Sequence, residues 1–200
     1  MKLYFFSILF FFLSVSLLGK EIPMEFYKRQ RLSQYELTPY ILFIDTQKQE
    51  MAVFKNNIYF KSYVISTAKR GEGQEIDSQK TPMGLHRIFQ KIGGEAPINT
   101  IFIGRKNTGK VWDDQFSERG KDFILTRILR LEGLEEGINR GQDCQGKIVD
   151  TLQRMIYIHG TNQEDMLGKP SSMGCIRMEK NDVRELFSEA PEGSLVWIGS

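Results

Sequence analysis

The chain has 200 residues, of which 40% are hydrophobic and 26% are charged. Its 27 Lys and Arg residues nearly balance its 25 Asp and Glu residues, and the formal net charge is +2. Because the charges are interspersed and form no basic stripe, the sequence argues against a nucleic-acid partner. Beyond the N-terminal segment roughly 180 residues remain, which suits one domain with a sizeable core.

The N-terminal segment carries the features of an export signal. Residues 3–18 contain no charged side chain and follow Met1 and Lys2. A cation followed by a short apolar run is typical of such signals, whereas a transmembrane helix needs about 20 apolar residues. We therefore predict an export signal over residues 1–19. The alternative is an uncleaved signal anchor, and the chain would then meet the membrane only through this segment.

Residues 20–38 are charged and irregular, so we expect a lead-in segment or a short helix there. From residue 39 the pattern becomes that of β-strands. The predicted strands span residues 40–44, 51–54, 58–67, 85–89, 123–131, 155–158 and 193–198. Asn56 and Asn57 tolerate the positive φ of a two-residue hairpin between the second and third strands.

The segments between these strands are predicted to be mostly loops. Residues 68–80 are polar, and residues 81–84 are expected to form a turn. Residues 90–120 are rich in Gly, Asn, Asp and Lys, and we interpret them as an irregular lid with Trp112 and Phe116 as aromatic interruptions. Asn181 and Asp182 are expected to cap a short helix over residues 183–188. The resulting expectation is a single mainly β domain over residues 39–199.

Cys175 is the candidate nucleophile. It lies in the sequence Ser-Ser-Met-Gly-Cys-Ile-Arg-Met (171–178), sixteen residues after His159. A thiol is largely protonated near its free pKa of about 8.5, and an imidazole or cationic neighbour raises the thiolate fraction. The backbone N–H groups at 173–175 could converge on a developing oxyanion, with Gly174 allowing close approach. If the segment is extended, Arg177 shares a face with Cys175 and could hold a substrate carboxylate or brace the turn.

His159 is the candidate base. It ends an apolar strand and precedes Gly160, which would aim it into a cleft from a rigid element. A third group should fix the tautomer of its imidazole. Glu164 and Asp165 belong to the following loop, so a backbone carbonyl could serve instead.

Other uses of the same residues have to be weighed. A Cys144–Cys175 disulfide is compatible with an exported chain, although the two cysteines have different sequence settings. His86 lies in the middle of a strand and is interpreted as structural. A zinc site from His86, Cys144, His159 and Cys175 would lack the usual short-spaced ligand pairs, so no metal is predicted.

The motif residues resemble those of a known family. Ile158-His-Gly-Thr161 followed by Ser172-Met-Gly-Cys-Ile-Arg-Met178 resembles the YkuD-type L,D-transpeptidases of bacterial cell walls. Thr81-Pro-Met-Gly84 is similar to that family's Thr-Pro-x-Gly turn. Residues 124–129 with 133–135 resemble the subgroup common in Gram-negative bacteria, which implies a periplasmic or cell-envelope location.

The resemblance implies a sandwich-like, mainly β fold with few helices and an enzyme that needs no cofactor. By that analogy Cys175 attacks the third residue of a peptidoglycan stem peptide, D-alanine leaves, and His159 handles the protons. An amine from a second stem then yields a 3→3 cross-link, a protein is another conceivable acceptor, and water would make the enzyme an L,D-carboxypeptidase. Ser172 and Gly160 are assigned, with residues 173, 174 and 177, to the oxyanion and substrate-binding surroundings.

One position departs from the family pattern. The commonest motif is Ser-His-Gly-Cys, and this chain has Met173 in place of that histidine. Methionine cannot accept a proton, so the base role would rest on His159. A non-catalytic wall-binding homologue is therefore the remaining alternative.

Overall fold

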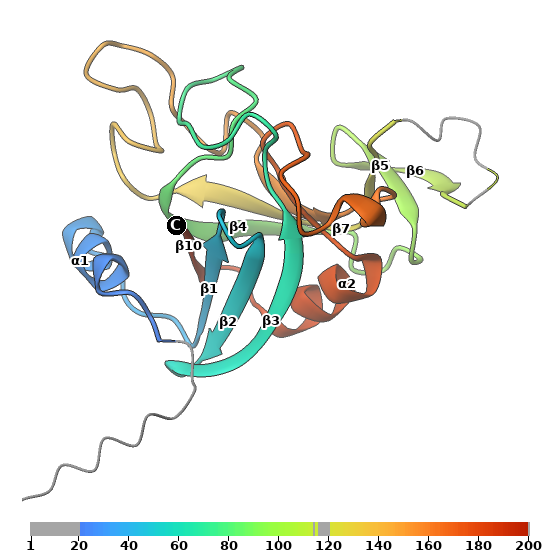
Figure 1. Ribbon diagram of the computed structural model, residues 1–200, viewed down its shortest axis with the longest axis horizontal. Coiled ribbons are helices and arrows are strands. Elements are labelled where there is room, and N and C mark those ends of the chain that lie inside the picture. The colour runs from blue at the N-terminus through green and yellow to red at the C-terminus, as the bar shows by residue number, and fades with distance from the viewer. Residues whose placement is uncertain (1–20, 114, 116–120, 200) are drawn as a thin grey trace, which may run out of the picture.

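The computed structural model describes residues 21–113, 115 and 121–199 (Figure 1). The predicted export signal and Phe116 therefore lie outside the described residues. The first elements are α1 (Met24–Ser33), β1 (Tyr40–Asp45), β2 (Glu50–Lys55), β3 (Ile58–Ser66), β4 (Gly84–Ile92), β5 (Thr100–Ile103) and β6 (Lys106–Val111). They are followed by β7 (Ile124–Gly133), β8 (Tyr157–Gly160), a short 3-10 helix (Glu164–Met166), β9 (Ile176–Met178), α2 (Lys180–Glu189) and β10 (Leu195–Gly199). Among the helices of the described residues, none is long and apolar enough to cross a membrane.

The strands of the described residues form one sheet that closes on itself. Their order is β4-β10-β1-β2-β3-β9-β8-β7-β5-β6, and β4 also pairs with β7. This second pairing joins the first eight strands of that order into a ring, and β5 and β6 extend from β7. The prediction of a mainly β fold with few helices is confirmed, and the opposing halves of the ring face each other across one core.

The core inside the ring receives side chains from each of its eight strands. Leu42, Ile158 and Ile176 are among these residues, and all three are fully buried. Val183 and Leu186 of α2 pack into the same cluster, and Figure 1 shows α2 beneath the sheet. Burial of apolar surface contributes roughly 25 cal/mol per Å², so this shared core is the main source of stability.

The lead-in segment packs against the outer face of the sheet. Phe26 of α1 is fully buried and meets the Phe43 ring at 5.1 Å and the Trp197 ring at 6.4 Å. Since Leu42 points inward and Phe43 outward, both faces of β1 are covered. This explains why residues 40–44 read as a continuous apolar run rather than an alternating one.

The β2–β3 hairpin forms as predicted. Asn56 and Asn57 have φ values of 51° and 64° between the two strands, the left-handed conformation that asparagine tolerates.

Three predicted elements are corrected by the structure. Residues 90–120 are not irregular throughout, because they contain the end of β4 and the β5–β6 hairpin. The strand predicted over 155–158 is β8, which begins at Tyr157 and contains His159 instead of ending before it. The cap of α2 is Glu179, whose carboxylate accepts the N–H groups of Asn181 and Asp182, so the helix begins three residues earlier than predicted.

Candidate active site

Two neighbouring parallel strands bring Cys175 and His159 to one face of the sheet. In the pairing of β8 with β9, Ile158 lies beside Ile176 and His159 beside Arg177. The two isoleucines point into the core of the ring, so side chains at the alternate positions point to the opposite face. Cys175, one residue before β9, packs there against Phe102, Ile128 and Tyr157. The candidate nucleophile and base therefore share a face, and Cys175 lies two residues before Arg177, the residue that pairs with His159.

The surroundings of Cys175 favour the neutral thiol over the thiolate. Its Sγ donates to the carbonyl of Met155 at 3.6 Å, and Met155 has a left-handed φ of 57°. Burial raises the pKa of Cys175 to about 11, the N–H of Tyr157 lowers it, and the charge of Asp122 raises it. Arg154 and Arg177 lower the pKa without overcoming burial. The balance of these effects therefore disfavours the thiolate enrichment that a neighbouring imidazole was expected to give.

His159 is oriented by the backbone of the next residue. Its Nδ1 lies 2.8 Å from the carbonyl oxygen of Gly160, and the side chain is 3% exposed. Because a carbonyl can only accept, Nδ1 carries the proton and Nε2 keeps the lone pair that a base needs. Burial lowers the pKa of His159, Gly160 and Asp122 oppose that shift, and Arg177 adds to it. A backbone carbonyl is thus the orienting group, as the sequence allowed.

The turn before Cys175 is held by its own side chains. Ser172 Oγ donates to the Cys175 carbonyl at 2.6 Å and accepts the Gly174 N–H at 3.2 Å. Since the Gly174 N–H is already engaged, the candidate oxyanion donors in this turn are the N–H groups of Met173 and Cys175. The Met173 side chain is 70% exposed, so its thioether lies at the surface.

Thr81 ties this turn to the Thr-Pro-x-Gly segment. Its hydroxyl donates to the Gly174 carbonyl at 3.0 Å and accepts the Ala68 N–H at 3.0 Å. Gly174 has φ +129°, and a Cβ there would lie 3.1 Å from Ile156 Cδ1 and 3.3 Å from the Lys80 carbonyl oxygen. Glycine is therefore required at 174 by backbone conformation and by space.

Arg177 is a buried structural cation. It is fully buried, and one terminal nitrogen binds Gln163 Oε1 at 2.9 Å and Asp122 Oδ2 at 3.0 Å. The other binds the hydroxyls of Ser66 and Ser171. Of the two roles that the sequence left open, this geometry favours bracing the turn over holding a substrate carboxylate.

Asp122 and Arg154 were missed by sequence reasoning. Asp122 accepts from Thr161 Oγ1 at 3.0 Å and pairs with Arg177, which places a carboxylate near both candidate residues. Antiparallel pairing of residues 125–130 with 157–160 was the signal that could have found it, because that ladder places the residues just before β7 near those just after β8, where Asp122 meets Thr161. Arg154 donates to the carbonyls of three loop residues, 73, 74 and 80, and adds positive charge near Cys175.

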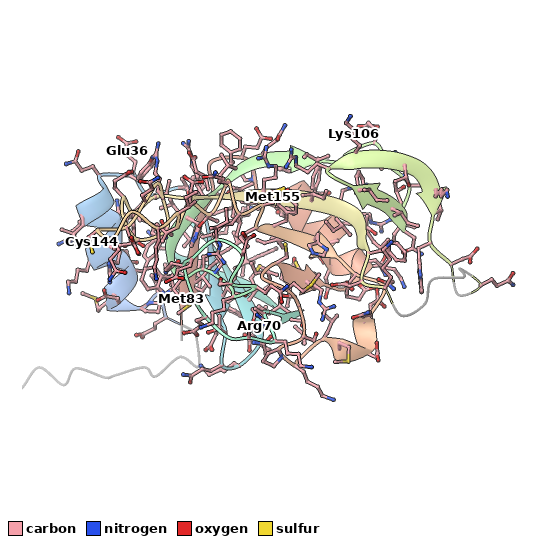
Figure 2. The ribbon with its side chains drawn as sticks, turned by 90° about the horizontal axis from the view of Figure 1, so that it is seen from above. Glu36, Arg70, Met83, Lys106, Cys144 and Met155 are labelled. Atoms are coloured by element: carbon pink, nitrogen blue, oxygen red, sulfur yellow. The ribbon has the colours of Figure 1, made fainter. Side chains whose placement is uncertain are left out.

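The alternative uses of Cys144 and His86 do not arise in this geometry. Both Cys144 and Cys175 are free thiols. Figure 2 shows Cys144 at the α1 end of the molecule, away from Met155, whose carbonyl contacts Cys175. His86 is fully buried between the Gly84 carbonyl and the Thr151 hydroxyl, which supports its structural role. In the described part of the chain no group of three or more His, Cys, Asp or Glu side chains is placed to hold a metal ion.

The β5–β6 hairpin borders the face that carries Cys175. Phe102 of β5 belongs to the cluster around Cys175, while Trp112, just after β6, packs against Ile101, Phe123 and Leu125. Figure 1 shows the hairpin projecting from the body of the sheet. The segment interpreted as a lid is therefore partly an ordered wall.

Fold and site together define a mainly β domain with a cysteine and a histidine on one face of its sheet. The chain belongs to the YkuD family, the L,D-transpeptidase catalytic domain, whose model matches residues 39–198.

Individual relatives carry related names. "Probable L,D-transpeptidase ErfK/SrfK" of Salmonella typhimurium is 32% identical over 125 residues, which cover 58% of this chain and 36% of that protein. "Probable L,D-transpeptidase YbiS" of Escherichia coli K12 is 30% identical over 117 residues, with 58% and 35% covered. The matches thus span about a third of the length of these curated relatives.

Two solved structures of L,D-transpeptidases align with this chain at low sequence identity. The enzyme from Xylanimonas cellulosilytica has a TM-score of 0.49 at 15% identity, with 82% of this chain and 62% of that chain covered. L,D-transpeptidase 3 of Mycobacterium tuberculosis, in complex with a faropenem-derived adduct, has a TM-score of 0.49 at 12% identity, with 81% and 60% covered.

Proposed function

We propose that this protein is a cysteine acyltransferase that acts on peptidoglycan stem peptides. The observation that supports it best is the position of Cys175 on the same sheet face as His159, whose Nε2 is left as an acceptor by the Gly160 contact. Membership of the L,D-transpeptidase family supplies the substrate class. Residues 39–199 would be the catalytic unit, and the apolar segment within residues 1–19 would direct it to the periplasm or cell envelope of a Gram-negative bacterium.

In the proposed acylation step, Cys175 Sγ attacks the carbonyl carbon of the third residue of the stem. The thiol proton moves to His159 Nε2, and the negative charge develops on the carbonyl oxygen. The N–H groups of Met173 and Cys175 would stabilise that oxyanion, an effect worth roughly 3 kcal/mol per donor. His159 then protonates the nitrogen of the departing D-alanine, which leaves a thioester on Cys175.

In the second step an acceptor amine attacks the thioester carbonyl. His159 removes a proton from that amine and returns it to the sulfur as the thiol leaves, so the resting enzyme is restored. An amine from another stem gives a 3→3 cross-link, and an amine on a protein gives an attached acceptor. Water in the same position would release a shortened stem.

The neutral resting pair has a mechanistic consequence. Because burial disfavours both the thiolate and the imidazolium, proton transfer between them is expected to accompany attack rather than precede it. Met173 does not weaken this scheme, since its exposed thioether has no proton-transfer role in it.

Exposure to a carbapenem, an acylating agent for this family by analogy, tests the nucleophile. Intact-mass measurement should find one adduct on the wild-type chain, the same adduct on the matched Cys144→Ala control and none on Cys175→Ala. An undiminished adduct on Cys175→Ala would refute the proposal. Incubation with tetrapeptide-bearing muropeptides then separates the outcomes, because dimers indicate transfer and tripeptide monomers indicate hydrolysis.

A further inference from the structure

A polar pocket lies beside the Arg177 brace, and neither Cys175 nor His159 lines it. Its volume is about 420 Å³, and its walls include Lys69, Gln163 and Asp165. The segment between β8 and the Cys175 turn supplies most of the wall, and Lys69 comes from the loop after β3. The proposed reaction assigns no role to this pocket.

Two opposite charges in the pocket have no partner in the described structure. Across the described ranges, neither the Lys69 ammonium nor the Asp165 carboxylate makes a hydrogen bond or an ion pair, although both line one pocket. The neighbouring acid, Glu164, is different because it pairs with Lys180 at 3.4 Å. The pocket therefore offers a cation and an anion that are both available to a ligand.

The remaining wall complements these charges. Gln163 Oε1 accepts a hydrogen bond from Arg177, so the Gln163 Nε2 group is left as a donor. This amide can bind an anion together with the Lys69 ammonium. Met166 and Pro170 add apolar atoms to the wall of the pocket. We propose that this pocket binds an α-amino acid headgroup, with the carboxylate on Lys69 and Gln163 and the ammonium on Asp165.

The pocket shares two wall residues with the brace behind the nucleophile. Gln163 and Ser171 line the pocket and also bind the guanidinium of Arg177, two residues after Cys175. A zwitterion of this kind occurs in free D-amino acids and at the side-chain end of a stem-peptide diamino acid. A role of the pocket in recognising the stem peptide rests on the function proposed above. The affinity of the pocket for the headgroup does not depend on that function.

Titrations of the full-length chain followed by amide NMR test the proposal. The probes are D-alanine, N-acetyl-D-alanine, which lacks the ammonium, and D-alaninamide, which lacks the carboxylate. D-alanine should shift amides within residues 162–171. Because both charged groups are solvent-exposed, each single-charge analogue should bind about two- to fivefold more weakly. In Lys69→Met, D-alaninamide should bind as well as D-alanine, because the cation that holds the carboxylate is gone. In Asp165→Asn, N-acetyl-D-alanine should bind as well as D-alanine, because the anion that holds the ammonium is gone.

Lys169→Met is the matched control, because Lys169 is an exposed lysine of the same region that does not line the pocket, and it should leave every affinity unchanged. Equal affinity for all three probes, or unchanged discrimination in both pocket variants, would overturn the proposal. A tripeptide ending in meso-diaminopimelate and its lysine counterpart identify the source. Tighter binding of the meso-diaminopimelate tripeptide than of the lysine tripeptide indicates that the ligand is the stem peptide. Equal binding of the two tripeptides, with D-alanine still bound, indicates that the ligand is a free amino acid. Since no acylation is involved, these outcomes are independent of the carbapenem test.

Discussion

Alkylation of the two cysteines at increasing pH tests the neutral resting state of Cys175. Burial raises the pKa of this thiol to about 11. At about pH 8 roughly 0.1% of such a thiol is ionised, compared with about a quarter of a free thiol whose pKa is about 8.5. The difference in thiolate population is therefore on the order of 200-fold.

The effect of the smaller thiolate population on the reaction rate is partly offset by the higher nucleophilicity of the Cys175 thiolate. A more basic thiolate reacts faster, with a Brønsted slope of about 0.4–0.5, which recovers about tenfold. Cys175 should thus react roughly 20-fold more slowly than an ordinary exposed thiol near pH 8, and about tenfold faster for each pH unit up to the pKa.

Iodoacetamide labelling followed by peptide mass spectrometry measures both sites in one sample, and exposed Cys144 is the internal reference. His159→Gln should leave the Cys175 profile unchanged, because a neutral imidazole contributes no charge to it. If Cys175 reacts as fast as Cys144 at neutral pH, or its rate levels off well below its expected pKa, a preformed thiolate exists and the burial argument is wrong.

Three further predictions concern the site and its supports. His159→Gln should slow adduct formation with a carbapenem by about 100- to 10,000-fold, since a positioned base typically contributes that much, and time-resolved intact mass measures it. Thr81→Val removes a hydroxyl that serves two buried backbone groups, so urea unfolding should show a loss of about 1–3 kcal/mol. Stability should also fall as the pH drops from 6.5 towards 4, because burial lowers the pKa of His86 to about 4 and the unfolded chain takes up the proton first. The loss should approach about 3 kcal/mol, measured as the unfolding free energy against pH.

Each of these predictions has a control. Ser78→Ala removes a hydroxyl that is bonded outside the core and should cost much less than Thr81→Val. His86→Gln should flatten part of the pH profile, and an unchanged slope would contradict the assignment to His86. A His159→Gln chain that acylates at the wild-type rate would show that another group removes the thiol proton.

The elements predicted correctly are those with strong local signals. Residues 40–44 are apolar because β1 is covered on both faces, and Asn56 and Asn57 adopt the backbone conformation that their side chains tolerate. β6 gave no such signal, since its residues are mostly exposed and polar and it is a strand only through pairing with β5. Tertiary contacts decide such segments, and pattern alone does not reveal them.

The residues of the candidate site also fall into those that local motifs indicate and those that only tertiary contacts reveal. Cys175, His159 and the Gly174 turn lie in compact motifs that the sequence displays. Asp122 reaches Arg177 across 55 positions of the chain through the β7–β8 ladder, so no local pattern indicates it. The raised pKa of Cys175 was also beyond the sequence, because it comes from burial beside the cluster of Phe102, Ile128 and Tyr157.

The strand order also determines where another polypeptide could add to this sheet. β4 and β7 are each paired on both sides, whereas β6 stands at the end of the described order with β5 as its neighbour. A terminal strand presents unsatisfied N–H and C=O groups that can template aggregation. Lys106 and Lys110 lie on β6, and charged side chains at such a border discourage intermolecular pairing. We therefore expect these two lysines to disfavour pairing between the β6 strands of separate copies at high concentration.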